Sequence, residues 1–156
     1  MSYIEDIVLV PDISGTDGIV SYEVRTGGAH SDNEVAVKIL DEDGNCVASA
    51  EGREGTVTIP DARLWWPFPG TPYLYRAEVT YGGDIYEESF GIRTVKVEGS
   101  SFLINGEPFY FKGFGKHEDS PFHGRGLDVC LDVKDVNLIH WLNANSFRTS
   151  HYPYAE

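Results

Sequence analysis

The amino-acid sequence predicts a mainly β protein in two parts. Residues 1–97 are expected to form an antiparallel β-sandwich of the immunoglobulin-like kind, and residues 98–156 the opening strand–helix–strand portion of a parallel sheet. Two observations predict this order. Short segments of alternating polarity, separated by glycine-rich turns, run to about residue 92. Farther along the chain, the spacing of apolar residues changes from two to that of a helix.

The expected sandwich strands are bounded by turn residues. Residues 34–40 alternate regularly, and residues 81–84 place Gly82-Gly83 at the tip of a two-residue hairpin. Other turns are expected at Gly27-Gly28 and Asp43-Gly44. The expected strands are 3–10, 19–24, 34–40, 45–50, 56–59, 73–81 and 84–92. The side chains that we expect to be largely buried are Val35, Val37, Ile39, Trp65, Tyr75 and Val79.

The second part begins with a hairpin signal. Residues 102–104 and 108–112 flank Asn105-Gly106, which favours a tight turn. Residues 132–143 then predict an amphipathic helix, with Asp132 as its N-cap or first-turn anion, and residues 146–149 predict a strand. The apolar stripe of this helix is Val133, Val136, Ile139 and Leu142, with Leu138 and Trp141 beside it.

Two strands of a parallel sheet cannot enclose a core of their own. We therefore expect the sequence to be an internal fragment of a longer chain. Its uncovered helix stripe and strand edges should lead to self-association, to strand exchange, or to folding back on the sandwich.

The charge balance excludes two classes of partner. The chain has 12 Lys and Arg against 25 Asp and Glu, a net charge of −13, which disfavours nucleic acid and anionic membranes. Cys46 and Cys130 lie far apart and fit no metal spacing, so we expect two reduced thiols. No signal-peptide pattern follows Met1, and a cytoplasmic location is the expectation.

Several chemistry-bearing residues have an ordinary structural explanation. The aromatic residues of 65–66 and 73–75 could stack on sugars, but we favour their capping the sandwich core. His140 is expected at the boundary of the helix's apolar face. A metal site is the alternative for one loop, but its spacing matches no metal motif, and we favour a solvated or ion-paired loop. The residues of that loop are His117, Glu118, Asp119 and His123.

The segment 145–153 is the strongest functional candidate. Ser150 and His151 could be a nucleophile and its base, but neighbouring strand residues point to opposite faces. Alternation places Phe147 beneath helices and Arg148 on the opposite, inner face, where a buried guanidinium needs an anion. His151 lies just beyond the strand. Arg148 and His151 can share a site only if the chain bends near residues 149–150.

Several strings resemble one known family, glycoside hydrolase family 2. The segment 145–153, Asn-Ser-Phe-Arg-Thr-Ser-His-Tyr-Pro, resembles the front part of a sequence signature of this family. Residues 64–67, 73–75 and 91–94 look like the end of its sandwich domain, and residues 102–110 look like its entry into the catalytic barrel. Residues 112–119 and 124–128 are similar to its β-glucuronidase branch.

The resemblance implies that residues 98–156 begin a (β/α)₈ barrel. It also implies a retaining enzyme that hydrolyses terminal β-D-glucuronides with two glutamates on later barrel strands, so these 156 residues alone should be inactive. His151 is then expected to line the sugar subsite, and Arg148 to keep the nucleophile ionised. No catalytic residue of this segment, metal or organic cofactor is implied.

The expected partner of the longer protein is thus a carbohydrate, a β-glucuronide. The alternatives are a β-galactosidase or another family 2 glycosidase, and a stand-alone carbohydrate-binding or interaction module. On this interpretation, replacing His117 or His123 should be milder than replacing His151.

Overall fold

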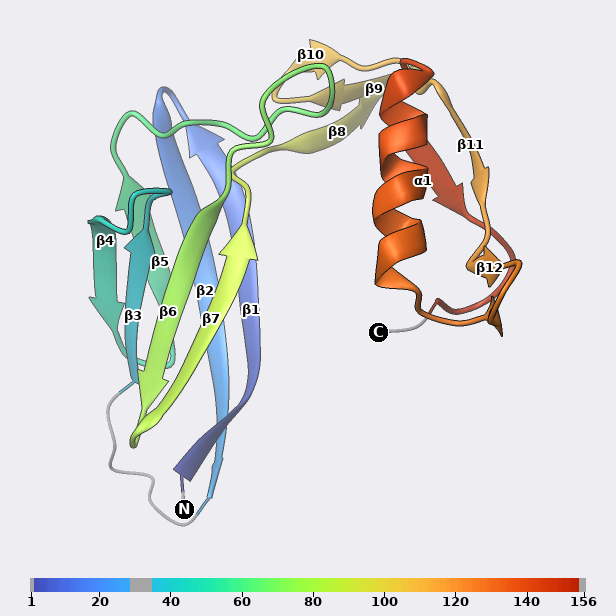
Figure 1. Cartoon of the computed structure of the whole chain (residues 1–156). Helices are drawn as coiled ribbons and strands as arrows, with labels where there is room; N and C mark the ends of the chain where they lie inside the picture. The colour runs from blue at the N-terminus through green and yellow to red at the C-terminus, as the bar shows by residue number, and fades with distance from the viewer. Residues whose placement is uncertain (1, 29–34, 155–156) are drawn as a thin grey trace. The chain divides into compact units, whose positions relative to one another are not determined.

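The structure, a computed structural model, describes residues 2–28 and 35–154 and is mainly β, as predicted (Figure 1). It contains two compact units. One comprises Met1–Trp66 and Thr71–Pro108, and the other comprises Pro67–Gly70 and Phe109–Glu156. Glu34, the first residue of one expected strand, lies outside the described residues, as do Met1 and Glu156, the outer limits of the two expected domains.

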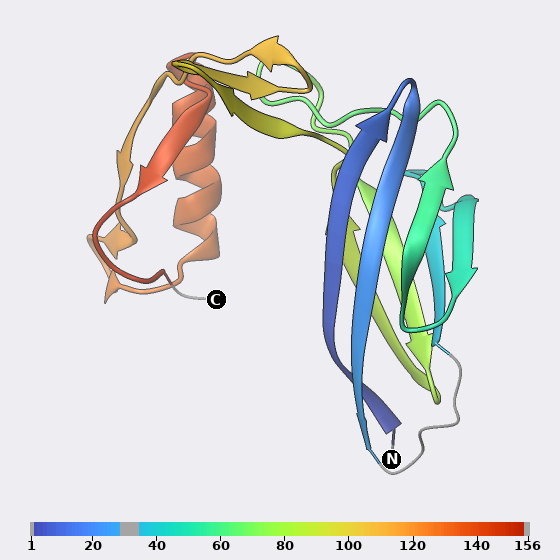
Figure 2. The ribbon, with the colours of Figure 1, turned by 180° about the vertical axis from the view of Figure 1, so that it is seen from behind.

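The first unit is built on two antiparallel sheets that lie face to face (Figures 1 and 2). The three-stranded sheet has the order β1-β2-β5 and consists of β1 (Ser2–Ser14), β2 (Asp17–Gly28) and β5 (Glu54–Ile59). The four-stranded sheet has the order β4-β3-β6-β7 and consists of β3 (Val35–Leu40), β4 (Cys46–Glu51), β6 (Tyr75–Tyr81) and β7 (Asp84–Phe90). The predicted sandwich is confirmed.

The core lies between the sheets and follows the alternation of the sequence. On β2, Val20, Tyr22 and Val24 are buried, whereas Ser21 and Glu23 face solvent. Of the side chains expected to be buried, five are at most 4% exposed: Val35, Val37, Ile39, Tyr75 and Val79.

Trp65 is the exception among the expected core residues, because it is only half-buried. Its ring lies beside Gly91, where an added Cβ would come within 2.7 Å of it, and the guanidinium carbon of Arg93 lies 4.8 Å from the centre of the ring. Trp65 therefore packs between these neighbours instead of filling the space between the sheets.

The turns divide into correct and incorrect predictions. Gly82 and Gly83 have φ of 58° and 94°, as the tight turn between β6 and β7 requires. The turn predicted at Gly27-Gly28 is wrong, because both residues belong to β2 and pair with Tyr3 and Ser2. The strand continues through these glycines because β1 is long enough to pair with β2 beyond its alternating segment.

A small meander completes the first unit. It consists of β8 (Val95–Glu98), β9 (Ser101–Ile104) and β10 (Glu107–Pro108). The Asn105-Gly106 tip is confirmed, with φ of 51° and 79°. The strand expected over 108–112 stops at Pro108, because the backbone beyond it bonds elsewhere: the Asn145 side chain accepts from Lys112 N and donates to Tyr110 O.

The second unit has the predicted strand–helix–strand order. Its elements are β11 (Gly113–Lys116), β12 (Asp119–Ser120), β13 (Gly124–Arg125), α1 (Val129–Trp141) and β14 (Ser146–Thr149). β11 and β14 pair in parallel, and β12 and β13 form a short hairpin.

Helix α1 starts three residues before the expected start at 132. Asp128 is its N-cap, because Asp128 Oδ1 accepts from Leu131 N at 3.1 Å, and Asp132 lies in the first turn. No residue of α1 is buried. Neither α1 nor any other helical segment in the described ranges has the length and apolar character needed to cross a membrane.

Candidate functional site

The candidate site lies where two parallel strands end. β11 and β14 are in register, with Gly115 opposite Arg148 and Lys116 opposite Thr149. Their carboxyl ends therefore meet at the same edge of the sheet, the edge at which barrel enzymes carry their active sites. His117 follows β11 directly, and His151 lies two residues after β14.

These two histidines lie against each other. The ring centres of His117 and His151 are 5.6 Å apart and meet edge to face at 74°. The ring of Tyr152 lies 5.6 Å from that of His117, also edge to face. Asp119 and Arg125 adjoin these rings, and we call the five residues together the strand-end cluster: His117, Asp119, Arg125, His151 and Tyr152.

Polar contacts orient the cluster. Nδ1 of His117 lies 3.2 Å from Oδ2 of Asp119. The guanidinium carbon of Arg125 lies 4.1 Å from the centre of the Tyr152 ring, a cation–π arrangement. The Tyr152 hydroxyl accepts a hydrogen bond from the backbone N–H of Glu118 at 2.7 Å. The cluster thus joins the end of β14 to the loop that follows β11.

The backbone changes direction at His151. β14 ends at Thr149, Ser150 is buried, and His151 has a φ of 70°. A left-handed conformation at a residue other than glycine costs about 1–3 kcal/mol and needs support from its surroundings. The alternation of β14 consequently does not extend to His151. A bend at this point is what a site shared by Arg148 and His151 requires.

The register also determines which face of β14 carries Arg148. Lys116 lies on the helix side of the sheet, because its Nζ is 2.7 Å from Oδ1 of Asp132 on α1. Thr149 and Phe147 share that side by alternation, so Arg148 lies on the face turned away from the helix. In a barrel that face is the interior. Arg148 is exposed here, and no carboxylate in the described ranges forms an ion pair with it.

Lys116 fastens β11 to the helix. Its side chain is 12% exposed and also lies 3.6 Å from Asp135. The hydrogen bond to Asp132 is the main cause that raises the pKa of Lys116 above its ordinary value, and burial opposes it. This ion pair fixes the helix beneath the strand that leads to His117.

The other two histidines in the described ranges, His123 and His140, and the two cysteines carry no comparable arrangement. His123 lies 3.6 Å from Asp128 and is largely exposed, and His140 stacks on Phe68 with ring centres 4.6 Å apart. Within residues 2–28 and 35–154, no three His, Cys, Asp or Glu side chains are grouped so that they could hold a metal ion. Cys46 and Cys130 are free thiols, as predicted.

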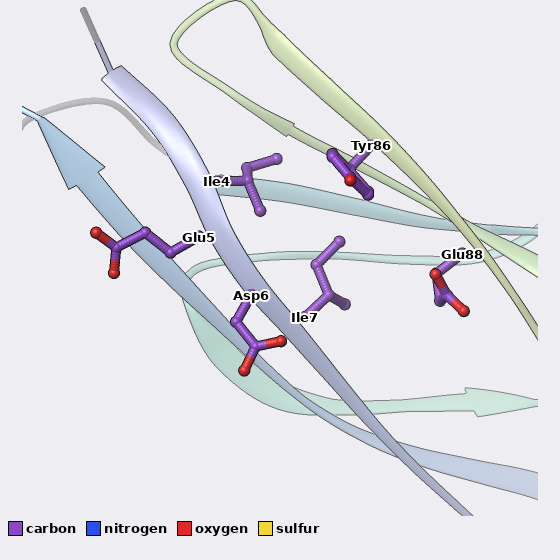
Figure 3. Close-up of a pocket in the computed structure, with 6 residues that line it drawn as sticks. All are labelled: Ile4, Glu5, Asp6, Ile7, Tyr86 and Glu88. Carbon is purple, nitrogen blue, oxygen red and sulfur yellow. The ribbon is translucent and has the colours of Figure 1, made fainter. Parts of the chain in front are cut away.

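A shallow hollow on the sandwich has a structural explanation (Figure 3). Ile4 and Ile7 of β1 point toward β7, which carries Tyr86 and Glu88, whereas Glu5 points away from it. The register of β1 shifts at Glu5, which is a β-bulge on an edge strand. The hollow is therefore the junction of two sheet edges.

Sequence reasoning did not foresee that His117 lies beside His151. From the sequence, His117 is expected in a loop and His151 beyond a strand end, with nothing to connect them. The predicted strand–helix–strand order could have indicated this contact. Two parallel strands that are joined through a helix have their carboxyl ends at the same edge of the sheet. His117 is the first residue after β11 and His151 the second after β14, so both lie at that edge.

Comparison with known families identifies the family to which both parts of the chain belong. Residues 2–93 match the family model described as glycosyl hydrolases family 2, and residues 95–156 match the model of the family's TIM barrel domain. The chain belongs to glycosyl hydrolases family 2, and β11, α1 and β14 are the opening of its barrel.

The relatives named here are β-glucuronidases. The chain is 52% identical to the β-glucuronidase of Paenibacillus borealis and 49% identical to that of Rattus norvegicus, in each case over 99% of this chain. Among solved structures, the Faecalibacterium prausnitzii β-glucuronidase matches with a TM-score of 0.91 and 57% identity over 99% of this chain and 25% of its own. The Ruminococcus gnavus enzyme in complex with D-glucuronic acid matches with a TM-score of 0.92 and 44% identity, over 99% of this chain and 27% of its own. The chain spans about a quarter of the curated relatives' length, 26% and 25% for the two named here.

Proposed function

We propose that the protein to which these residues belong is a retaining β-glucuronidase that hydrolyses terminal β-D-glucuronides. The observation that carries this proposal is the identity of 52% to a β-glucuronidase over 99% of the chain, through the sandwich and the barrel opening alike. The position of the strand-end cluster, at the carboxyl ends of parallel strands, supports the same function.

Within that enzyme, His151 and Arg148 are the substrate-site residues of this segment. His151 contacts the sugar, because it follows a barrel strand and its imidazole can donate to or accept from a hydroxyl. Arg148 faces the barrel interior, where its guanidinium can keep the nucleophilic carboxylate ionised. Two glutamates on other barrel strands, roughly 5 to 5.5 Å apart, supply the acid/base and the nucleophile of a retaining mechanism.

The domain boundary belongs to this proposal as well. We place the sandwich at residues 1–97 and the beginning of the barrel at residues 98–156. The two family models divide near this position, between residues 93 and 95. The meander β8–β10 spans the proposed boundary and belongs to the same compact unit as the sandwich.

The proposed partner of the whole enzyme is a β-glucuronide, in keeping with the relative that was solved with D-glucuronic acid. We also propose a cytoplasmic location. The two exposed free thiols support it, since unpaired exposed cysteines suit a reducing compartment.

The proposal is tested with two proteins and two substrates that share one aryl leaving group. The full-length protein should hydrolyse the aryl β-glucuronide with a kcat/KM roughly a hundredfold or more above that for the aryl β-galactoside, because polar groups built for one substrate are left unpaired by the other. The 156 residues alone should turn over neither substrate. Preference for the galactoside, or activity of the 156 residues that persists through repurification, would refute the assignment.

A further inference from the structure

Tyr152 is the residue through which the loop after β11 is attached to the end of β14. Its hydroxyl accepts from Glu118 N at 2.7 Å at the start of the loop, and its ring lies beneath the guanidinium of Arg125 near the loop's end. The ring of Tyr154 stacks on the Tyr152 ring with centres 5.3 Å apart. One side chain thus fixes both ends of the segment 118–125.

The same tyrosine sets the position of His117. The rings of Tyr152 and His151 both contact the ring of His117, each at 5.6 Å and edge to face. The contact to Asp119 uses Nδ1 of His117, which leaves Nε2 free of that contact. A carboxylate on one imidazole nitrogen fixes the orientation of the ring, as it does for histidines that bind metals.

His151 depends on this neighbour for its own orientation. It is exposed and has a left-handed φ of 70°, and its imidazole forms no hydrogen bond or ion pair with any side chain or backbone group of residues 2–28 or 35–154. The His117 ring packs against the His151 ring edge to face and restricts its rotation. A substrate-binding imidazole that is free to rotate would lose the benefit of pre-organisation.

We infer that Tyr152 is a positioning residue, which holds the His117 ring against the His151 ring and so orients His151 toward the sugar. This inference rests on the proposed function, because it assumes that His151 contacts the substrate. On this inference, the contacts of Asp119, His117 and Tyr152 act together to orient His151.

A double-mutant cycle in the full-length enzyme separates positioning from folding. Tyr152→Leu removes both the ring and the hydroxyl, and we expect kcat/KM for an aryl β-glucuronide to fall roughly 10- to 50-fold, mostly in kcat, because an interaction that matters most in the transition state is weakened. In the His151→Ala background, the same Tyr152→Leu change should alter kcat/KM less than about twofold, since residues that act as a unit are not additive.

Two further variants make the cycle decisive. Tyr152→Phe keeps the ring contacts and loses only the bond to Glu118, so its effect should be smaller, roughly threefold, and should likewise vanish with His151→Ala. It also supplies the cycle if Tyr152→Leu fails to fold. Tyr110→Leu is the matched control, because Tyr110 lies in the same unit but outside the strand-end cluster and is 77% exposed in the 156 residues, and it should leave kcat/KM unchanged.

Additive effects of the Tyr152 and His151 substitutions would overturn the inference and leave Tyr152 a purely structural residue. A failure of the proposed function is a different result, namely full-length protein that does not hydrolyse the β-glucuronide. The cycle can then be run on whichever glycoside the protein does hydrolyse, and the same comparison of backgrounds decides the role of Tyr152.

Discussion

At the scale of single residues, Arg148 and His151 show what a local pattern can predict. Alternation along 146–149 was sufficient to place Arg148 on the face away from α1, because a strand has a fixed period of two. It could not place His151, whose φ of 70° breaks that period. Nor could it bring His117 to His151, because their contact depends on the register of two strands more than thirty residues apart in the sequence.

Asn145 is a residue whose role only the structure explains. It opens the string that resembles the family signature, and no chemistry could be assigned to it from the sequence. In the structure, its amide accepts from Lys112 N at 2.8 Å and donates to Tyr110 O at 2.9 Å, while its own backbone N–H donates to Lys112 O. Asn145 therefore anchors the chain that enters β11.

The first prediction concerns the two proposed site residues, His151 and Arg148, in the full-length enzyme. His151→Ala should lower kcat/KM for an aryl β-glucuronide by roughly ten- to a thousand-fold, about 1.4 to 4 kcal/mol of lost transition-state stabilisation. Arg148→Ala should cost at least as much, because under the proposed function the nucleophilic carboxylate would lose its counter-charge. Steady-state kinetics on the purified variants measures both.

His123→Ala is the control for that experiment, since the His123 side chain is largely exposed and lies outside the strand-end cluster, so that its loss should change kcat/KM little. The effect of His117→Ala should fall between the control and His151→Ala, because the His117 ring packs against His151 and, under the proposal, orients it. A dispensable His151 together with an essential His123 would contradict the assignment.

At the scale of elements, turn chemistry and alternation predicted most of the sandwich. The Asn105-Gly106 and Gly82-Gly83 tips were correct because the left-handed conformation that they require is local. Strand length was not predictable, since β1 and β2 extend each other well beyond their alternating segments. The start of α1 was missed because its N-cap, Asp128, precedes the periodic stretch by four residues.

The second prediction concerns the close approach of β11 and β14. A Cβ at Gly113 would lie 1.9 Å from the carbonyl oxygen of Ser146, whereas one at Gly115 would lie 2.7 Å from Ser150 Oγ. Either substitution by alanine should destabilise the pair by about 1–3 kcal/mol. Urea unfolding of the chain, with hydrogen exchange of the β11 and β14 amides, measures the loss.

The two glycines differ in whether a second change can rescue them. Ser150→Ala removes the Oγ and leaves the Cβ at 4.0 Å, so Gly115→Ala/Ser150→Ala should regain most of the stability. Gly113→Ala should not be rescued by any side-chain change at Ser146, because the obstacle is backbone. If Gly113→Ala left the free energy of unfolding unchanged, the close approach of β11 and β14 at Gly113 would not be needed for stability.

The third prediction is the pH dependence of the contact between β11 and α1. The pKa of Lys116 is raised in the folded state, mainly by its hydrogen bond to Asp132. Its stabilising contribution is therefore fully present below the unfolded pKa of about 10.5 and is lost as the pH rises through the higher folded value. Lys116→Met should cost about 1–3 kcal/mol near pH 7, and this difference should shrink above about pH 10.5.

Urea unfolding followed by the helical circular dichroism signal, at several pH values from 7 to 11, tests the dependence on Lys116. Lys134→Met is the matched control, because Lys134 is an exposed lysine of the same helix. If the Lys116→Met difference were the same at pH 7 and pH 11, the ammonium group would not be responsible for it.

At the scale of the whole molecule, the two units differ in how much apolar surface they bury. The sandwich encloses a continuous apolar core between two sheets. In the second unit, no residue of α1 is buried, and its apolar residues are among the most exposed in the described part of the chain, with Val133 at 58%, Trp141 at 79% and Leu142 at 57%. The sequence predicted a helix with apolar residues at these positions, but a pattern of apolar residues does not identify what covers them.

The last prediction is that the 156 residues, studied alone, self-associate. Exposed apolar stripes and unpaired strand edges lower their free energy by meeting another copy, and the net charge of −13 opposes this most at low salt. Sedimentation velocity between about 1 and 100 μM should therefore show a mass that increases with concentration, and more strongly at higher salt. Val133→Lys with Leu142→Lys should reduce the association, whereas Val10→Lys, at an equally exposed position of β1, should not. A monomer at all concentrations whose stripe binds an apolar dye would contradict self-association, because the surface would then be open to water and still unpaired.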